Sequence, residues 1–364
     1  MMIDRNQLRN IDWILIGLLI INSVIGLAFI HSSSHYLPGN HALKQLVWLF
    51  VALFALFLFL SMNYRILMTY SLYFYGVAVF VLAGVLLFGR LTAGTKSWIV
   101  LPFFQIQPSE ITKIAVILVL AHLFSEYRRD SLSIGHGVLG FLIVGVPVLL
   151  VGLQPDLGTA LTYIPILLAI FFMVGLRRKT VIILLVLALL SGILGWNVML
   201  KDYQKDRITT LLSPNKDPLG SGYQTIQSKI AIGSGGFLGK GYKKGTQSQL
   251  RFLPARHTDF IFSVIGEESG FIGAIVTFLF YFLFLVRLFQ SVTKSRDRAG
   301  VLIIYMVGGM IAFQFFVNVF MTLGLFPIAG ITLPLISYGG SSLLTNFLAV
   351  SLVINVRMRR FVNV

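Results

Sequence analysis

Residues that could carry out chemistry are concentrated between Tyr223 and Gly270, where a stretch rich in glycine and lysine leads into an apolar segment. Asp259 stands at the boundary between the two, and Glu267 and Glu268 lie further into the apolar segment. A pliable backbone, positive charge and a carboxylate therefore meet where the chain enters a membrane. This combination suits a reaction on an anionic, lipid-linked substrate.

Asp259 has three interpretations. A carboxylate at a membrane surface can act as a general base, or it can hold a metal ion. It can also be an ordinary helix N-cap, which would stabilise the helix by about 0.3–1 kcal/mol. The basic and glycine-rich sequence directly upstream favours a functional interpretation.

Positive charge precedes Asp259, and no acidic residue interrupts it back to Asp217. Nearby glycines allow backbone N–H groups to approach a phosphate closely, so these cations are candidate ligands of a pyrophosphate. Attraction to anionic lipid head groups is the alternative. The candidates are Lys229, Lys240, Lys243, Lys244, Arg251 and Arg256.

Further charged residues lie inside apolar runs. An unpaired carboxylate at the depth of Glu267 and Glu268 costs at least about 2.5 kcal/mol, so we expect these two to be paired inside the bundle or to shape a hydrated cavity. Glu110 and Lys113 are spaced i, i+3 and share a helix face. They predict an internal ion pair, which could shape a polar cavity together with Asp156.

Composition indicates a membrane protein. The 364 residues have a mean hydropathy of +0.87 and only 12% of them are charged, about half the usual fraction for a soluble protein. Repeated apolar runs predict an all-α, polytopic membrane fold. The absence of cysteine excludes disulfides, thiolate catalysis and cysteine-bound metal.

We predict ten transmembrane helices in a single integral membrane domain, residues 1–364. A spanning helix needs roughly 20 residues, within a range of about 17–25, and the fourth and tenth predicted spans are short. The predicted spans are Asp12–His31, Gln45–Met62, Ile66–Phe88, Glu110–Phe124, Ile134–Leu153, Leu157–Val174, Thr180–Trp196, Phe260–Leu288, Ala299–Leu323 and Ser342–Val356.

Basic residues in short loops orient the chain. With a cytoplasmic N-terminus, 15 of the 29 Lys and Arg residues lie in cytoplasmic segments and three in short outer loops. Both termini are therefore expected in the cytoplasm. Because topology explains half of the positive charge, the net charge of +16 does not require a nucleic-acid partner.

The long connection between the seventh and eighth spans, residues 197–259, is predicted on the outer face. Connections of this length are usually functional. Asp202–Leu212 and Gly222–Ile232 are candidate helices within it. The glycines between Gly220 and Gly245 disfavour a stable helix there.

Four even-numbered spans begin on the outer face with residues typical of helix N-termini. Free N–H groups and the partial positive charge of a helix N-terminus attract anions, so converging starts would make a phosphate-binding site. The four starts are Gln107–Glu110, Gln154–Asp156, His257–Asp259 and Gly339–Ser342.

Two aromatic residues in outer segments have open roles. Trp98 is either an interfacial anchor or a platform that stacks on a sugar. His257 could act as a base, but no set of His or Cys ligands accompanies it, so a zinc site is not expected.

Taken in order, these motifs resemble the SEDS family (shape, elongation, division and sporulation) over nearly the whole chain. The sequence GTQSQ favours its elongation branch, RodA, over its division branch, FtsW. The motifs are Phe104–Glu110, Gln154–Thr159, Gln227–Gly236, Gly245–Gln249, Phe252–Pro254, His257–Phe262 and Ser337–Ser341.

The resemblance implies a peptidoglycan glycosyltransferase that polymerises lipid II on the outer face of the bacterial cytoplasmic membrane. It places the family's essential aspartate on Asp259, its glutamate and lysine on Glu110 and Lys113, and its loop tryptophan on Trp98. Lipid II and a glycan on undecaprenyl pyrophosphate are the implied substrates. The implied partner is a class B penicillin-binding transpeptidase.

The implied reaction uses Asp259 as a general base on the 4-hydroxyl of GlcNAc, with inversion at the anomeric carbon and a pyrophosphate leaving group, with or without a divalent cation such as Mg²⁺ or Mn²⁺. A flippase that transports lipid II, and a scaffold for the transpeptidase, remain alternatives. The candidate substrate-binding residues are Trp98, Lys113, Lys229, Lys240, Lys243, Arg251, Arg256, Ser337, Gly339, Gly340 and Ser341, and the candidate cavity-shaping residues are Glu110, Asp156, Glu267 and Glu268.

Overall fold

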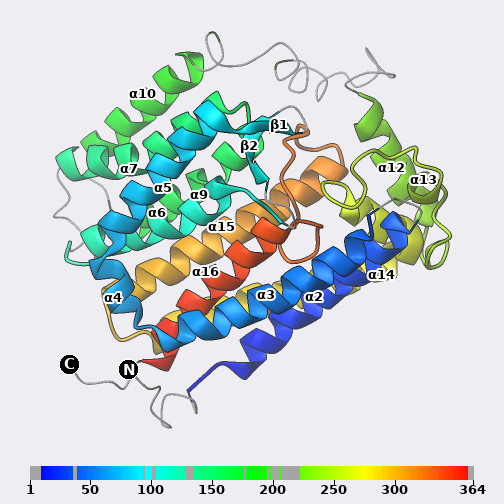
Figure 1. Ribbon diagram of the computed structural model, residues 1–364, viewed down its shortest axis with the longest axis horizontal. Helices are drawn as coiled ribbons and strands as arrows, with labels where there is room; N and C mark the ends of the chain where they lie inside the picture. The colour runs from blue at the N-terminus through cyan, green and yellow to red at the C-terminus, as the bar shows by residue number, and fades with distance from the viewer. Residues whose placement is uncertain are drawn as a thin grey trace.

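The computed structural model describes residues 10–35, 39–92, 95–100, 104–127, 134–175, 178–194, 197, 205 and 222–359. The fold is a bundle of long helices that run side by side (Figure 1). Helix α2 (Trp13–Ser34) begins and helix α16 (Gly340–Met358) ends at one end of the bundle, and helices α12 (Tyr223–Gly235) and α13 (Thr246–Gln249) lie at the other. The predicted all-α membrane fold is confirmed.

Eight helical segments of the described chain are long and apolar enough to cross a membrane. The other two predicted spans coincide with α6 (Pro108–Phe124) and α10 (Arg178–Leu194), which have 17 residues each and lie at the lower end of the spanning range. The number ten therefore stays a prediction. The eight segments are α2, α3 (His41–Ser61), α5 (Ser71–Phe88), α7 (Ile134–Leu153), α8 with α9 (Leu157–Leu161 and Ile164–Val174), α14 with the 3₁₀ turn η3 (Ile261–Gln290 and Ser291–Lys294), α15 (Arg298–Thr322) and α16.

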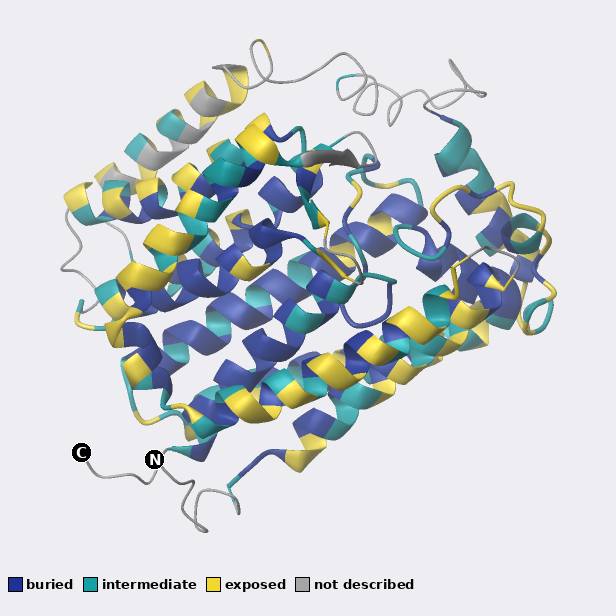
Figure 2. Ribbon diagram, viewed as in Figure 1, coloured by how far each residue is buried: buried dark blue, intermediate teal, exposed yellow. Residues whose placement is uncertain are grey.

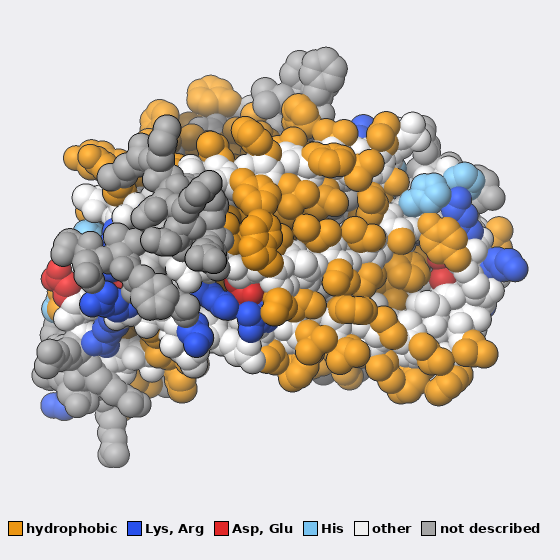
Figure 3. Space-filling view, turned by 90° about the horizontal axis from the view of Figure 1, so that it is seen from below, with side chains coloured by type: hydrophobic (Ala, Val, Ile, Leu, Met, Phe, Trp, Pro, Cys, Tyr) orange, Lys and Arg blue, Asp and Glu red, His pale blue; other side chains and the backbone are white. Residues whose placement is uncertain are grey.

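The central helices are α15 and α16, and the other helices pack around them (Figures 1 and 2). In the most apolar window of each helix, 67% of α15 and 83% of α16 is buried, against 17% of α5. Seen from below, hydrophobic side chains cover the middle of the molecule and charged side chains gather toward its two ends (Figure 3). An apolar middle between charged ends is the pattern of a multi-pass membrane protein.

The structure differs from the sequence-based expectation in the third predicted span and in an outer loop. The third span is two helices, α4 (Tyr64–Thr69) and α5, which break at Tyr70. An antiparallel sheet of β1 (Arg90–Thr92), β2 (Thr95–Val100) and β3 (Gln105–Ile106) stands where a loop was expected. β2 contains Thr, Trp, Ile and Val, which favour strands, but its short length hid the signal.

Helix α12 bears out the helix expected over Gly222–Ile232 and continues to Gly235, against the expectation that glycine would stop it. The reason is packing, because a Cβ at Gly235 would lie 2.0 Å from the carbonyl oxygen of Gly266 on α14. Glycine is thus the residue that permits the close approach of two backbones. The helix expected over Asp202–Leu212 lies outside the described residues, apart from Lys205.

Candidate active site

The helix starts at the α12 end of the bundle are joined by side chains. Gln107, before α6, donates from Nε2 to Oδ2 of Asp156 at 2.6 Å, and Asp156 is the N-cap of α8. The backbone N–H of Gln107 donates to Oγ of Ser341, in the first turn of α16, at 3.0 Å. Ser341 in turn donates to the carbonyl of Gln105 on β3 at 3.2 Å. Three of the four predicted starts therefore meet through Gln107.

The fourth start, the turn before α14, is held by its main chain. The carbonyls of residues 257, 258 and 259 each accept a hydrogen bond from a different residue, and two of the donors belong to the segment between α15 and α16. The donors are, in that order, Tyr338 N at 2.9 Å, Ser337 Oγ at 2.5 Å and Asn318 Nδ2 at 2.8 Å. Three anchored carbonyls in succession fix the path of the chain at Asp259.

Asp259 is half-buried and stands one residue outside the N-cap of α14, which is Phe260. Its carboxylate faces Gly330, where a Cβ would lie 3.8 Å from Oδ2 of Asp259. The adjacent Ala329 touches α8, because a Cβ at Gly158 would lie 2.0 Å from the carbonyl oxygen of Ala329. Asp259 thus lies where α14, the segment 324–339 and, through Ala329, the start of α8 come together.

The glycines of the Ser337–Ser341 motif have packing roles. The N–H of Gly339 donates to Oε1 of Gln45 at 3.1 Å, which ties the segment to α3. Gly340 lies against Trp48, since a Cβ there would be 2.1 Å from the indole. A larger residue at Gly340 would require Trp48 or α16 to move, whereas a Cβ at Gly339 would meet only the Cβ of Ser342 at 3.6 Å.

Glu110 and Lys113 form the expected internal ion pair on α6, with Oε1 and Nζ 2.8 Å apart. The side chain of Lys113 is fully buried, and that of Glu110 is 10% exposed. Tyr163, the N-cap of α9, donates to the carbonyl of Ser109 at 2.6 Å, next to Glu110 in the chain. The pair therefore lies directly below the α6 start that Gln107 connects to α8 and α16.

Glu267 is fully buried and holds the segment after α12. It accepts hydrogen bonds from the backbone N–H groups of Gln247 and Ser248 at 2.8 and 3.0 Å, both in the first turn of α13. It also pairs with Lys240 at 2.9 Å. A carboxylate at a helix N-terminus is stabilising, so Glu267 fastens α13 to α14.

Glu268 and Arg256 attach the same segment to the C-terminal end of α2. Ser32 donates to both carboxylate oxygens of Glu268, at 2.6 and 2.7 Å, and Gln249 donates to one of them at 3.1 Å. Arg256 is buried and donates from Nε to the carbonyl of Ser33 at 2.7 Å. These charged residues hold α2 and the outer segment together.

The basic residues between Lys229 and Arg256 have different surroundings. Lys240 and Arg256 are engaged by Glu267 and by the carbonyl of Ser33, as described. Lys229 is exposed on α12 and lies over Gly324, where a Cβ would be 2.2 Å from its Cε. The Nζ of Lys243 is 5.9 Å from the centre of the Tyr242 ring, and Arg251 is exposed. Burial, with a smaller contribution from the charge of Arg251, lowers the pKa of Arg256, so these two arginines lie near each other.

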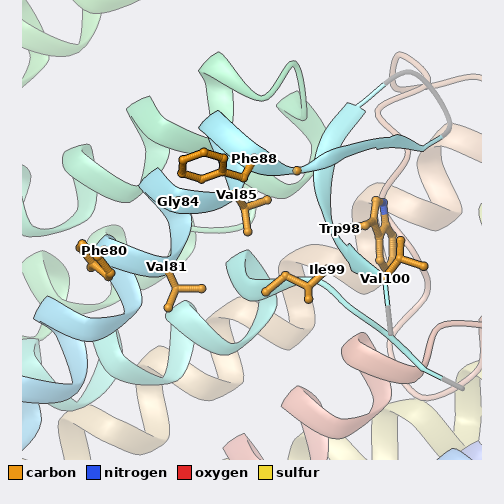
Figure 4. Close-up of a pocket in the computed structure, with 9 residues that line it drawn as sticks. Phe80, Val81, Gly84, Val85, Phe88, Trp98, Ile99 and Val100 are labelled. Atoms are coloured by element: carbon orange, nitrogen blue, oxygen red, sulfur yellow. The ribbon is translucent and has the colours of Figure 1, made fainter. Parts of the chain in front are cut away.

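Trp98 lines an apolar pocket of about 440 Å³ between β2 and the last turns of α5. Figure 4 shows Trp98 and Val100 on one side of β2 and Ile99 on the other, toward α5. Phe80 and Phe88 complete the wall and are 78% and 86% exposed. β2 pairs with β3, and Ser341 donates to the carbonyl of Gln105 on β3. The sheet is thereby connected to the first turn of α16, which follows the segment in which Ser337 holds the main chain next to Asp259.

His257 packs against two rings. Its ring centre lies 4.8 Å from that of His41 and 5.6 Å from that of Tyr338. Burial, with smaller contributions from His41 and Arg256, lowers the pKa of His257 to about 4. His257 is therefore neutral near pH 7, beside Asp259.

The structure contains no group of three or more His, Asp or Glu side chains that could hold a metal ion, among the residues it describes. Asp259 stands apart from Glu267 and Glu268, which are bound to α13 and α2. The divalent cation considered from the sequence therefore stays a prediction.

Sequence reasoning missed two polar residues of this site, Asn318 and Gln45. Asn318 lies within the ninth predicted span and is fully buried, and Gln45 begins the second. A polar side chain inside an apolar run is costly unless it is hydrogen-bonded. That cost is the signal by which both could have been found.

Comparison with known proteins adds independent findings. The family model FTSW_RODA_SPOVE, described as cell cycle protein, matches residues 9–361. Peptidoglycan glycosyltransferase MrdB of Escherichia coli K12 is 39% identical over 293 residues, which cover 79% of this chain and 78% of that protein. A chain from a structure of a peptidoglycan synthase complex that coordinates polymerization and crosslinking is 35% identical, with a TM-score of 0.82 over 97% of this chain and 99% of its own. The rod shape determining protein RodA of Thermus thermophilus is 30% identical, with a TM-score of 0.72 over 97% and 98% of the two chains.

Proposed function

The chain belongs to the FtsW/RodA/SpoVE family of cell cycle proteins and is a peptidoglycan glycosyltransferase, and we propose that it polymerises lipid II with Asp259 as the general base. The observation that carries the proposal is the setting of Asp259. Its peptide is anchored, it lies outside the N-cap of α14, and Gly330 stands near its carboxylate. A base needs a carboxylate held in place within reach of the hydroxyl.

In the proposed reaction, Asp259 takes the proton from the 4-hydroxyl of the GlcNAc of lipid II. The freed oxygen attacks the anomeric carbon of the growing glycan, and undecaprenyl pyrophosphate leaves from the opposite face. One displacement inverts that carbon.

Negative charge grows on the pyrophosphate as it leaves, and the nearby groups suited to stabilise it are cations and N–H groups. Lys229, Lys243 and Arg251 are candidates on the outer segment. Lys240 and Arg256 are candidates as well, and in the structure they hold Glu267 and the carbonyl of Ser33. The joined starts of α6, α8 and α16 add helix N-termini to the same region.

Both substrates carry long apolar tails. We propose that the pocket between α5 and β2 receives part of one tail, because its wall is apolar and its edge is exposed at the hydrophobic surface of the molecule. Trp98 on β2 would stand where tail and head group meet, as interfacial tryptophans do.

The proposed location is the bacterial cytoplasmic membrane, with both termini in the cytoplasm and Asp259 on the outer face. The distribution of basic residues supports this orientation. The proposed partner is a class B penicillin-binding transpeptidase, because a similar chain belongs to a complex that couples polymerization to crosslinking.

A lipid II transporter is the second candidate. The observation that favours it is the fully buried Lys113 with Glu110, since charged residues inside a membrane bundle often mark a path. Against it, the polar network lies at one end of the bundle, whereas transporter sites are usually near the middle of the membrane.

The test uses the full chain, purified with its transpeptidase, and fluorescent lipid II. Glycan strands are separated on a gel, and movement of lipid II across the bilayer is measured in liposomes. We expect glycan strands to form. The assay is run in parallel with Mg²⁺, with Mn²⁺ and with a chelator. Movement of lipid II without any strands would contradict the proposal and favour the transporter.

A further inference from the structure

Asn318 connects the proposed catalytic segment to the rest of the bundle. It lies in α15, is fully buried, and donates from Nδ2 to two carbonyls, that of Asp259 at 2.8 Å and that of Ile331 at 2.7 Å. These two carbonyls belong to different segments, one before α14 and one before α16. A single amide group therefore joins the two segments where they meet.

The two acceptors determine how the amide is oriented. Two carbonyl oxygens require two N–H donors, and only the nitrogen end of an asparagine side chain supplies both. The donor capacity of Asn318 is thus fully used. Its Oδ1 is buried without a hydrogen-bond partner, which is costly in an apolar interior and indicates that the position is kept for the donors.

The contacts around Asn318 form a closed ring. Asn318 holds the carbonyl of Asp259 and the carbonyl of Ile331, Ile331 follows Gly330, and Gly330 faces the carboxylate of Asp259. The main chain of Asp259 and the wall opposite its side chain are therefore fixed by the same group. A shift of either segment would change the distance between the carboxylate and Gly330.

We propose that Asn318 is a positioning residue for the glycosyl transfer, which sets the carboxylate of Asp259 at the distance the acceptor hydroxyl requires. The inference rests on the proposed role of Asp259 as the base. Asn318 touches neither substrate in this account and acts through the main chain of Asp259. A misplacement of about 1 Å in a reacting group can lower a rate by roughly 100-fold.

The chain offers a matched control in Asn355 of α16. Asn355 is also fully buried and also uses Nδ2 to hold carbonyls of a turn, those of Phe59 at 3.0 Å and Met62 at 2.6 Å. It lies at the other end of the bundle, where α2 begins. Removing either amide breaks a tether between a helix and a turn, but only one tether reaches Asp259. Asn355 also accepts through Oδ1 from Nε of Arg359 at 3.0 Å, so its removal tests at least as large a structural loss.

The experiment compares Asn318→Leu, Asn355→Leu and Asp259→Asn in the purified complex with the transpeptidase. It measures kcat and KM for lipid II polymerisation per folded protein, together with the thermal unfolding midpoint. We expect Asn318→Leu to lower kcat by roughly 10- to 100-fold with KM within about twofold. Asn355→Leu is expected to lower the unfolding midpoint similarly while kcat stays within about twofold. If Asn318→Leu does not accumulate in the membrane, Asn318→Ser replaces it in the comparison. Because serine keeps one donor, we expect its kcat to fall by less than the kcat of Asn318→Leu is expected to fall.

Two results would overturn the inference. The first is a fall in kcat for Asn318→Leu, or for Asn318→Ser in its place, no larger than the fall for Asn355→Leu. Asn318 would then have only a structural role. That result, with Asp259→Asn inactive, leaves the base assignment standing. If Asp259→Asn polymerises normally, the base assignment fails and the inference fails with it.

Discussion

Asp12 and Asp259, at opposite ends of the bundle, are held differently. At the Asp12 end, where α2 begins and α16 ends, Asp12 caps α2 through the N–H of Leu15 at 3.2 Å and pairs with Arg287 and Arg357. At the Asp259 end, the carboxylate lies outside the cap, and neutral donors hold the main chain.

Asp297 repeats the pattern of Asp12. It caps α15 through the N–H of Gly300 at 2.9 Å, accepts from the hydroxyl of Tyr64 at 2.5 Å and lies 3.3 Å from Arg65. Carboxylates at this end are therefore bound as structural ions. At the other end, neutral donors hold the main chain at Asp259, and Gly330 stands near its carboxylate.

The largest effect is expected from Lys113→Met, which leaves the carboxylate of Glu110 buried without its partner at 2.8 Å. Breaking a buried pair on one side costs about 3–5 kcal/mol. We expect a marked fall in the thermal unfolding midpoint in detergent and in polymerisation. The double variant Glu110→Gln with Lys113→Met should recover much of the stability, and a double variant no more stable than the single one would show that the pair is not the cause.

His257 should make stability depend on pH. Its pKa is lowered to about 4 by burial, so between pH 6.5 and 4 the unfolded chain binds a proton that the folded chain does not. Stability then falls as the pH is lowered through this range, by up to about 3 kcal/mol. Unfolding curves at several pH values should show a smaller fall in the free energy of unfolding for His257→Phe than for the parent protein. The same dependence on pH in both proteins would contradict the lowered pKa of His257. His41, Tyr338, Arg256 and Asp259 are the neighbouring titratable groups.

Asp12→Asn tests the other end. Asparagine is as good an N-cap as aspartate, so the change removes only the charge that faces Arg287 and Arg357. We expect a loss of about 2 kcal/mol, because these arginines are 26% and 17% exposed and can reach water. The unfolding midpoint should fall while kcat per folded protein is unchanged. A fall in kcat as large as that of an Asp259 variant would remove the contrast between the ends.

Gly330→Ala should have the smallest effect on stability. Gly330 has φ of +69°, where alanine costs about 1 kcal/mol. A Cβ would also stand in van der Waals contact with Oδ2 of Asp259, at 3.8 Å, and would take up space beside the carboxylate. We therefore expect kcat per folded protein to fall. Gly17→Ala on α2, where φ is not positive and nothing lies within 4 Å of the new Cβ, is a control without strain and should leave kcat unchanged. Equal kcat values for both variants would argue against a site at Gly330.

The sequence predicted the helices well because long apolar runs have one stable form in lipid. It also predicted the Glu110–Lys113 pair, because i, i+3 spacing is enough to bring two side chains together. The ring of contacts through Asn318 and Gly330 could not be derived, since it joins residues 59 and 13 positions apart. The same limit applies to Lys240 and Arg256, whose contacts with Glu267 and Ser33 were not foreseen; their expected role at a phosphate stays a prediction.

The most direct test of the account is the single-turnover rate of strand extension by Asp259→Asn, with lipid II binding measured on the same sample. Loss of a general base typically lowers a rate by about 10²–10⁴-fold. We predict a rate at least about 100-fold below that of the parent protein, with lipid II still bound. A rate within about twofold of the parent would contradict the assignment of Asp259 as the base.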